Sequence, residues 1–332
     1  MKKIAICIPT YNRQLYLQEC INSILSDVKS NNLNTQIEIC ISDNCSTDDT
    51  ESMISTMSSQ TNVQIIYHRN NTNIGPDLNY LKCIEIASAE YCWFMGSDDA
   101  ITHGSIVKVM DELKSYQADV YIGNRILCDQ NLKPIKNQRF FKSIKKTIFN
   151  TNELDSYFLN SISLGAVFSY LSSIVVKKSK WDSIEYNEEY TGTAYPHVFI
   201  ILSFLLNKNS ILKIIPYAIV LCRTGNDSFL TQGVVKRFLI DVDGYLKLAN
   251  DLFKNDQEMR FNFLGILRSE NGFLRLLKMR SLTPDLEWGK INNKLRECGF
   301  NNKVLFLLNN NLKFVSFIIR QLLDIRAKIK LL

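Results

Sequence analysis

The sequence predicts an α/β protein, with a Rossmann-like, mostly parallel central sheet flanked by helices and a helical C-terminal extension. Short apolar runs alternate with helical patterns over the first hundred residues, which is typical of right-handed βαβ crossovers. From Val234 onward the hydrophobic spacing is helical throughout. The chain has 332 residues, 46% of them apolar and 22% charged, and this composition excludes a disordered chain or a coiled coil.

The elements follow one another in a regular order. Apolar runs predict strands at residues 3–9, 36–42, 63–68 and 91–95, separated by helical patterns at 13–29, 47–58 and 76–88. A further strand is expected at 118–126, followed by a basic, irregular stretch at 133–146. Strand-like runs at 166–176 and 211–222 then enclose a helix near 197–206.

The cysteines and the hydropathy pattern restrict the compartment. Nine cysteines are scattered singly and no two form a CxxC motif, which predicts free thiols in a reducing environment. No uncharged apolar stretch reaches the length of about 18 residues that spans a bilayer. The N-terminus enters a strand without a signal-like segment. We therefore expect a cytoplasmic protein.

Polar, turn-forming residues follow each of the first four predicted strands. In a parallel sheet, ligands bind beyond the carboxyl ends of the strands. Turn and capping chemistry alone explains any one such loop, but four in register favour one shared ligand site. The four loops are Pro9-Thr10-Tyr11-Asn12-Arg13, Ser42 to Asp49, Arg69 to Pro76 and Gly96-Ser97-Asp98-Asp99.

The residue types in these loops suit a nucleotide and a cation. Adjacent carboxylates at Asp98 and Asp99 are suited to a hard divalent ion such as Mg²⁺ or Mn²⁺, although Asp99 could equally cap the helix that follows. Asp43 could accept a hydrogen bond from a base, Tyr11 could stack on it, and Arg13 could reach a phosphate. The absence of a Walker A or GxGxxG motif argues against an NTPase or a dinucleotide enzyme.

The ordered set of motifs resembles glycosyltransferase family 2. The resemblance is carried by Ile8-Pro9-Thr10-Tyr11-Asn12-Arg13, Ile41-Ser42-Asp43-Asn44 with Ser46-Thr47-Asp48, Asn73-Ile74-Gly75 and the acidic strand end. It implies a GT-A fold and a nucleotide-sugar donor. It also implies a catalytic domain over residues 1–230, with a nucleotide-binding half (1–105) and an acceptor half (106–230), and an extension over 231–332.

A closer resemblance extends to about residue 255. Its motifs are Tyr91 to Asp99, Phe168 to Ser173, Tyr195-Pro196-His197-Val198-Phe199, Cys222-Arg223 and Asn226 to Phe229. They are similar to CDP-3,6-dideoxyhexosyltransferases of the abequosyltransferase type, which act in O-antigen biosynthesis. This similarity implies a CDP-sugar donor and the mannose of a polyprenyl-diphosphate-linked oligosaccharide as acceptor. The alternatives are a UDP-sugar-dependent transferase of another surface polysaccharide and a catalytically silent nucleotide-sugar-binding scaffold.

The resemblance also assigns site residues. Donor-binding positions fall on Thr10, Tyr11, Arg13, Asp43, Asn73, Gly75, Ser97 and Asp98, and a divalent cation (Mn²⁺ or Mg²⁺) falls on Asp98 and Asp99. The DxD motif of the family falls on Gly96-Ser97-Asp98 and so lacks its first aspartate.

The general base is less defined. The stretch that matches the acidic base of the inverting enzymes contains His197, which we expect to deprotonate the acceptor, with Glu188 and Glu189 as alternatives and Asp99 as a further catalytic group. A purely packing role for His197 at a helix start stays open. The sequence leaves open an inverting or retaining course.

The last thirty residues predict a basic amphipathic helix. Residues 303–332 carry six basic residues against Asp324 alone, so 6 − 1 = +5 of the net charge of +6 lies there, interleaved with long aliphatic side chains. This pattern is typical of a helix on an anionic membrane surface, and docking onto the protein's own core is the alternative. We therefore expect a peripheral protein on the cytoplasmic face of the inner membrane. Nucleic acid is not an expected partner.

Overall fold

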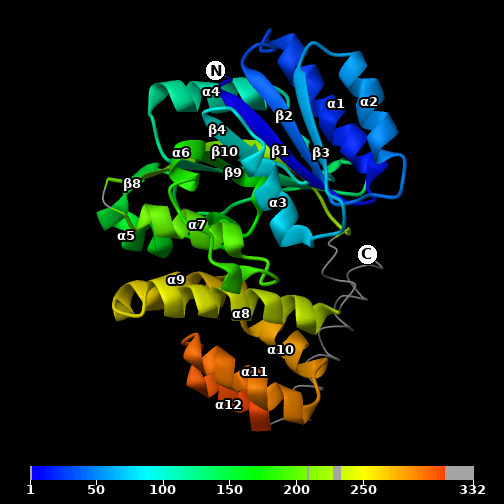
Figure 1. Ribbon diagram of the computed structural model, residues 1–332. Coiled ribbons are helices and arrows are strands. Elements are labelled where there is room, and N and C mark those ends of the chain that lie inside the picture. The colour runs from blue at the N-terminus through cyan, green and yellow to red at the C-terminus, as the bar shows by residue number, and fades with distance from the viewer. Residues whose placement is uncertain (1, 208, 227–232, 311–332) are drawn as a thin grey trace, which may run out of the picture. The chain divides into compact units, whose positions relative to one another are not determined.

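A computed structural model describes residues 2–207, 209–226 and 233–310. The chain divides into two compact units, Met1–Asn226 and Asp227–Leu332, and each is described by itself (Figure 1). The predicted division at residue 230 falls within 227–232, outside the described residues.

The N-terminal unit is a ten-stranded sheet with helices on its faces (Figure 1). Its strands are β1 (Ile4–Thr10), β2 (Ile37–Asp43), β3 (Gln64–Arg69), β4 (Tyr91–Phe94), β5 (Ala100–Ile101), β6 (Val120–Cys128), β7 (Pro134–Gln138), β8 (Ile148–Asn150), β9 (Ile174–Lys177) and β10 (Ile211–Arg223). Its helices are α1 (Gln14–Ser30), α2 (Thr50–Ser59), α3 (Pro76–Glu85), α4 (Ser105–Ser115), α5 (Leu154–Asn160), α6 (Lys178–Trp181) and α7 (Pro196–Leu205). Short 3₁₀ helices are η1 (Thr151–Glu153), η2 (Leu164–Val167), η3 (Leu171–Ser173) and η4 (Glu188–Tyr190).

The strand order is β3-β2-β1-β4-β9-β6-β10-β5, with β7 on β6 and β8 on β10. The first four strands pair in parallel, as the βαβ alternation predicts, and β2 is buried along its whole length because helices cover both faces. Strand β9 runs antiparallel to both β4 and β6, so the sheet as a whole is mixed. The predicted α/β class with a helix-flanked central sheet is confirmed.

The strand predicted at residues 166–176 is mostly wrong. Only Ile174–Lys177 form β9, and η2 and η3 occupy the preceding residues. Phe168 takes a left-handed backbone conformation (φ +69°), which ends η2 and is incompatible with a strand. The hydroxyl of Ser172 accepts from Gly96 N at 2.9 Å, while its carbonyl accepts from Trp93 Nε1 at 2.8 Å. These long-range bonds override the apolar pattern of the segment.

Two buried carboxylates fix the loops around β4. Asp27 of α1 accepts from the backbone N–H groups of Gly104 (2.5 Å) and Ile106 (2.9 Å), and so caps the start of α4. Glu38 of β2 is fully buried and accepts from Ser88 N (2.6 Å) and Ala89 N (2.9 Å) in the turn before β4. Both ends of the β4 region are therefore tied to the parallel half of the sheet.

The C-terminal unit is helical, as its sequence pattern predicts. It contains α8 (Val234–Leu252), α9 (Gln257–Glu270), α10 (Phe273–Ser281), α11 (Asp285–Glu297) and α12 (Asn302–Asn310). Trp288 is fully buried in it, and the rings of Tyr245 and Phe263 stack at 5.4 Å. The predicted basic amphipathic helix lies beyond residue 310 for most of its length, outside the described residues. Of the helices described, none is long and apolar enough to cross a membrane.

Candidate active site

The carboxyl ends of β1, β2 and β3 lie in register. Thr10 pairs with Asp43, which pairs with Arg69. The side chain of Asn44 joins the next loop, since its Nδ2 donates to Asn73 Oδ1 at 2.7 Å and its Oδ1 accepts from Ile74 N at 2.8 Å. The structure therefore brings the predicted strand-end residues of three loops to one edge of the sheet.

The loop after β3 ends at Gly75, which has a φ of +84°. A residue with a side chain rarely adopts this conformation, and glycine here lets the chain turn directly into α3. Gly75 N donates to Asn73 Oδ1 at 2.9 Å. The two predicted donor residues of this loop thus support each other.

Asp43 is fully buried, and protein groups hold both of its carboxylate oxygens. Ser46 N donates to Oδ1 at 2.9 Å, and the Tyr67 hydroxyl donates to Oδ2 at 2.7 Å. The guanidinium of Arg69 lies 3.9 Å from Oδ2. Burial and the adjacent carboxylate raise the pKa of Tyr67, so its hydroxyl remains a donor. The base-binding role of Asp43 stays a prediction.

Three further predicted donor residues lie on the β1 side or after β4. Thr10 Oγ1 is buried and has no hydrogen-bond partner among the described residues, so it can bond to a ligand or to water. Tyr11 exposes 44% of its surface, which leaves its ring accessible for stacking. Ser97 is buried between the end of β4 and Asp98.

Asp98 and Asp99 differ in environment although they are adjacent. Asp98 is partly exposed, and its Oδ2 accepts from Arg13 Nη1 at 2.7 Å and from Asn226 Nδ2 at 2.6 Å. Asp99 is buried. Its Oδ2 accepts from the hydroxyls of Tyr170 (2.6 Å) and Ser172 (2.5 Å).

Burial, with the charge of Asp98 as a second cause, raises the pKa of Asp99 to about 6. The other oxygen of Asp99, Oδ1, accepts from Arg223 N at 3.1 Å. Three protein donors therefore occupy its carboxylate. Asp99 does not cap a helix through the nearest N-terminus, because that of α4 is capped by Asp27.

Arg223, at the end of β10, organises this corner, and sequence analysis gave it no role. Its side chain is 2% exposed. Nε donates to the carbonyl of Asp98 at 2.8 Å, and the two terminal nitrogens bond to the carbonyl of Gln130 and the carboxylate of Glu19. In the sequence, only the Cys222-Arg223 motif pointed to this residue. Its contacts could not be predicted, because its partners lie up to 204 residues away in the chain.

Gly96 stands where the predicted DxD motif would have its first aspartate, and its surroundings leave little space for a side chain. A Cβ at this position would lie 3.1 Å from Asp98 Oδ1, 3.1 Å from Asp99 Oδ2 and 3.3 Å from Ser172 Oγ. A side chain at position 96 therefore requires the two carboxylates and the Ser172 hydroxyl to shift by a few tenths of an ångström. The hydroxyl of Ser172 occupies part of the space instead.

The donor set for a cation is correspondingly small. Among the residues that the structure describes, no three His, Cys, Asp or Glu side chains are grouped so as to hold a metal ion. Asp99 accepts from three protein donors, whereas Oδ1 of Asp98 has no such bond within the described part of the chain. The residues present therefore fit a cation held by Asp98, with diphosphate oxygens and water completing its shell.

His197 lies inside the unit at the start of α7. It is 2% exposed; Nε2 donates to the carbonyl of Phe168 at 2.8 Å, and Nδ1 lies 3.3 Å from the Tyr80 hydroxyl. Burial lowers its pKa to about 4. Its role as a base stays a prediction that this environment disfavours, because both ring nitrogens face protein groups.

Glu188 and Glu189 lie on η4 and are exposed. Asp77 of α3 holds the loop that follows, since its Oδ2 accepts from Gly192 N (2.9 Å) and Ala194 N (3.1 Å). The loop held by Asp77 leads from η4 to His197. The bonds to Asp77 connect this loop to α3, the helix that begins after Gly75.

The helix-flanked sheet, with polar loops at the carboxyl ends of its parallel strands, has the GT-A fold. The family model of glycosyl transferase family 2 matches residues 5–175. The abequosyltransferase RfbV of Salmonella typhimurium is 43% identical over 277 residues, which is 82% of this chain and 81% of that protein. The chain belongs to glycosyl transferase family 2, which confirms the predicted family, and it is a glycosyltransferase.

Two more distant proteins agree with this class. A GalNAc(5)-diNAcBac-PP-undecaprenol beta-1,3-glucosyltransferase of Campylobacter jejuni is 27% identical over 78% of this chain and 76% of that protein. The crystal structure of Staphylococcus aureus TarS 1–349 in complex with UDP-GlcNAc superposes with a TM-score of 0.66 at 16% identity, covering 96% of this chain and 92% of that chain. The latter likeness concerns the fold alone.

Proposed function

We propose that this glycosyltransferase transfers a 3,6-dideoxyhexose such as abequose from a CDP-sugar to the mannose of a polyprenyl-diphosphate-linked O-antigen oligosaccharide. The observation that carries the proposal is the 43% identity to an abequosyltransferase over four fifths of both chains. The motifs shared with that class lie on the elements that build the site, which include β4, η3 and the end of β10.

On the donor side, the loops after β1 and β4 supply groups of opposite charge. Arg13 and Asp98 form an ion pair at 2.7 Å, so a diphosphate bound beside this pair would meet a guanidinium that can donate to it and a carboxylate that can hold the cation. When bound, the cation would neutralise charge on the departing nucleotide. Tyr11 would stack on the base, with Asp43 and Thr10 Oγ1 as hydrogen-bonding groups beside it, and Asn73, Gly75 and Ser97 would line the same crevice.

For the acceptor proton, we favour Glu189 over His197 and Asp99. His197 and Asp99 are buried, whereas Glu189 is exposed on η4, just before the loop that Asp77 anchors. A base must reach the hydroxyl that it deprotonates. Replacing Glu189 by glutamine should lower kcat strongly and leave donor affinity unchanged, while Glu188→Gln serves as the neighbouring control. Equal kcat values for Glu189→Gln and wild type would refute the assignment.

The test of the function is a binding panel followed by transfer. CDP, UDP, GDP and dTDP are titrated by calorimetry with Mn²⁺ and with EDTA, on wild type, Asp43→Ala, Asp98→Ala and the exposed control Asp111→Asn. We expect CDP selectivity that Mn²⁺ strengthens and that only the first two variants lose, and transfer from CDP-abequose to a mannose-terminated acceptor. A preference for UDP would replace the donor assignment, and nucleotide binding without any transfer would favour the silent scaffold. Absence of binding to all four nucleotides would refute the proposal.

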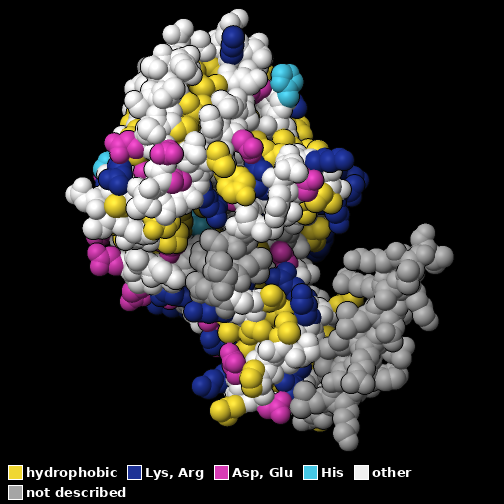
Figure 2. All heavy atoms as spheres, turned by 90° about the vertical axis from the view of Figure 1, so that its right-hand side faces the viewer, with side chains coloured by type: hydrophobic (Ala, Val, Ile, Leu, Met, Phe, Trp, Pro, Cys, Tyr) yellow, Lys and Arg dark blue, Asp and Glu magenta, His cyan; other side chains and the backbone are white. Residues whose placement is uncertain are grey.

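A second part of the proposal is a peripheral position at the cytoplasmic membrane. The predicted helix beyond residue 310 lies outside the described residues, but α10 and the start of α11 support the idea. Leu274, Leu282 and Leu286 are 60%, 53% and 85% exposed, and Arg275 and Lys278 are exposed between them. Figure 2 shows hydrophobic side chains lying among Lys and Arg on the C-terminal unit. Leucines beside cations suit an anionic lipid surface.

Sedimentation with vesicles tests this position. We expect the chain to sediment with vesicles that contain anionic lipid, and to be released by Leu282→Ser with Leu286→Ser and by deletion of residues 311–332. Exposed leucine Leu159, on the other unit, supplies the control variant Leu159→Ser. Unchanged sedimentation of all variants would refute membrane binding by the exposed leucines and by residues 311–332.

A further inference from the structure

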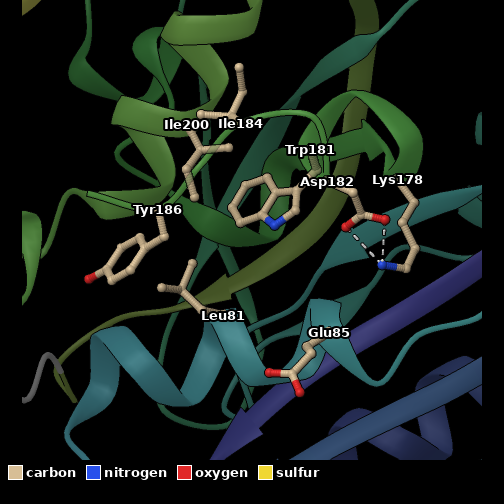
Figure 3. A pocket seen from close by; sticks show the side chains of 8 residues that line it. All are labelled: Leu81, Glu85, Lys178, Trp181, Asp182, Ile184, Tyr186 and Ile200. Atoms are coloured by element: carbon tan, nitrogen blue, oxygen red, sulfur yellow. Dashed lines mark hydrogen bonds and ion pairs between the residues drawn. The ribbon is translucent and has the colours of Figure 1, made fainter. Parts of the chain in front are cut away.

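A pocket of about 320 Å³ opens between α3, α6 and α7 (Figure 3). Its walls are aliphatic and aromatic: Leu81 comes from α3, Ile184 from the segment after α6, and Ile200 from α7, with Tyr186 at one end. The strand-end crevice uses none of these residues.

The indole of Trp181 lies in the centre of the pocket (Figure 3). Only 7% of the residue is exposed, and its ring packs against Phe94 with the centroids 5.3 Å apart. Its Nε1–H has no acceptor among the described residues, whereas the indole of Trp93 donates to a backbone carbonyl at 2.8 Å. The indole nitrogen of Trp181 is not fully buried, so its N–H can donate to an acceptor atom of a ligand or to water in the pocket.

Charged groups form the rim of the pocket. Glu85 lies on one side, and Lys178 on the other donates to both carboxylate oxygens of Asp182 at 2.9 Å. Hydroxyl groups are the ligand groups that suit this set, because a hydroxyl both accepts from the indole N–H and donates to a carboxylate. The two carboxylates disfavour a phosphate, and the charged rim disfavours a polyprenyl chain.

A sugar ring combines hydroxyl groups with an apolar face that packs on aliphatic and aromatic side chains. We propose that this pocket is a saccharide subsite, which binds a sugar residue of the oligosaccharide acceptor remote from the hydroxyl that reacts. The inference rests on the proposed function for the identity of the acceptor.

The positions of Leu81 and Glu85 along α3 support the assignment of the pocket as a saccharide subsite. Leu81 and Glu85 follow Gly75 by six and ten residues, which places them about 9 and 15 Å along the helix from the donor loop. An oligosaccharide, and not a single sugar, spans this distance. The Tyr186 hydroxyl lies 2.5 Å from Thr191 Oγ1, so the pocket wall is bonded to the loop that Asp77 holds beside η4.

The test compares long and short acceptors. Trp181→Phe removes the N–H and keeps an aromatic ring, Glu85→Gln and Asp182→Asn change only the rim, and Glu287→Gln on α11 is the exposed control. With a mannosyl-rhamnosyl-galactose acceptor, we expect KM to rise about tenfold in Trp181→Phe, the size of one lost hydrogen bond, with kcat and the Kd for CDP unchanged. With a monosaccharide acceptor the variants should match wild type.

Direct binding separates this inference from the proposed function. The trisaccharide alone is titrated while tryptophan fluorescence or calorimetry is recorded, so no transfer is needed. Binding that Trp181→Phe or Glu85→Gln weakens, without transfer from CDP-sugars, would support the subsite and refute the proposed donor. Equal trisaccharide affinity and KM in the wild type and the rim variants would overturn the subsite, as would binding of a polyprenyl phosphate in place of the sugar. The rim variants keep the test valid if Trp181→Phe does not fold.

Discussion

Replacing His197 by glutamine should remove a pH dependence from the stability of the N-terminal unit. The ring is 2% exposed, and its Nε2 donates to the carbonyl of Phe168 at 2.8 Å. A carbonyl can only accept, so Nε2 carries a proton, and burial lowers the pKa of the ring so that the imidazole is neutral near pH 7. Glutamine can place an amide N–H at the same carbonyl and does not titrate.

The magnitude follows from the two pKa values. Burial lowers the pKa of His197 from 6.5 to about 4, so between these values the unfolded chain binds more protons than the folded chain. The stability that neutral His197 contributes to the folded chain is therefore fully present above pH 6.5 and is lost as the pH falls toward 4. The loss reaches about 2 kcal/mol at pH 5 and about 3 kcal/mol below pH 4. Activity that depended on His197 as a base with this pKa would fall only as the pH drops through about 4.

Asp99 acts in the opposite direction and must be separated from this effect. Burial raises its pKa from 3.8 to about 6, so its contribution to stability is fully present below pH 3.8 and is lost as the pH rises through 6. In the wild type the two effects partly cancel between pH 4 and 6. The difference between wild type and His197→Gln isolates the histidine, because Asp99 is common to both.

The assay is denaturant unfolding of both proteins at pH 7.5 and pH 5.0. We expect the wild type to lose about 2 kcal/mol more than His197→Gln between these values. An NMR titration gives the pKa directly, since the chain has three histidines and exposed His103 serves as an internal reference. A His197 resonance that titrates near 6.5, or equal pH dependence of the two proteins, would show that the ring is accessible and the reasoning wrong.

Substitutions at three further positions test the corner around β4. Gly96→Ala should lower the free energy of unfolding by about 1–3 kcal/mol, because a Cβ meets Asp98 and Asp99 at 3.1 Å. Gly96→Asp should lower it further without strengthening Mn²⁺ binding. Thermal melts measure the stability of both variants, and a metal titration measures Mn²⁺ binding. Arg223→Lys keeps the charge but loses the fork, and should cost about 3 kcal/mol and weaken nucleotide binding in calorimetry. Asp27→Ala should cost about 1–2 kcal/mol in urea unfolding through the lost cap of α4, and Asp27→Asn should restore part of it.

The parallel half of the fold could be predicted because its signals are local. The apolar runs that became β1 to β4 and the helices between them set the pairing of neighbours. The register of Thr10 with Asp43 then follows from parallel strands of equal length. The insertion of β9 between β4 and β6 could not be predicted, because no local pattern distinguishes an antiparallel partner there from a parallel one.

The site was predictable as a place more than as a set of roles. The predicted strand ends gave the positions of Asp43, Asp98 and Asp99. Because Asp98 and Asp99 are the same residue type, the sequence could not show that Asp98 is partly exposed and Asp99 buried. That difference depends on Tyr170 and Ser172, which lie more than 70 residues further along the chain. The burial of His197 could not be predicted for the same reason, since burial is a property of the packed unit and not of the motif.

The lost aspartate of the DxD motif and the burial of Asp99 belong to one arrangement. A carboxylate at position 96 would add a third negative charge within reach of Asp98 and Asp99, in a corner where burial already raises the pKa of Asp99 to about 6. With Gly96, the neutral hydroxyl of Ser172 fills the space, donates to Asp99 and accepts from Gly96 N. The charge that remains on Asp98 is balanced by Arg13. The cation requirement of this site should therefore rest on a single carboxylate, and removing Asp98 should abolish the effect of Mn²⁺ on nucleotide affinity completely.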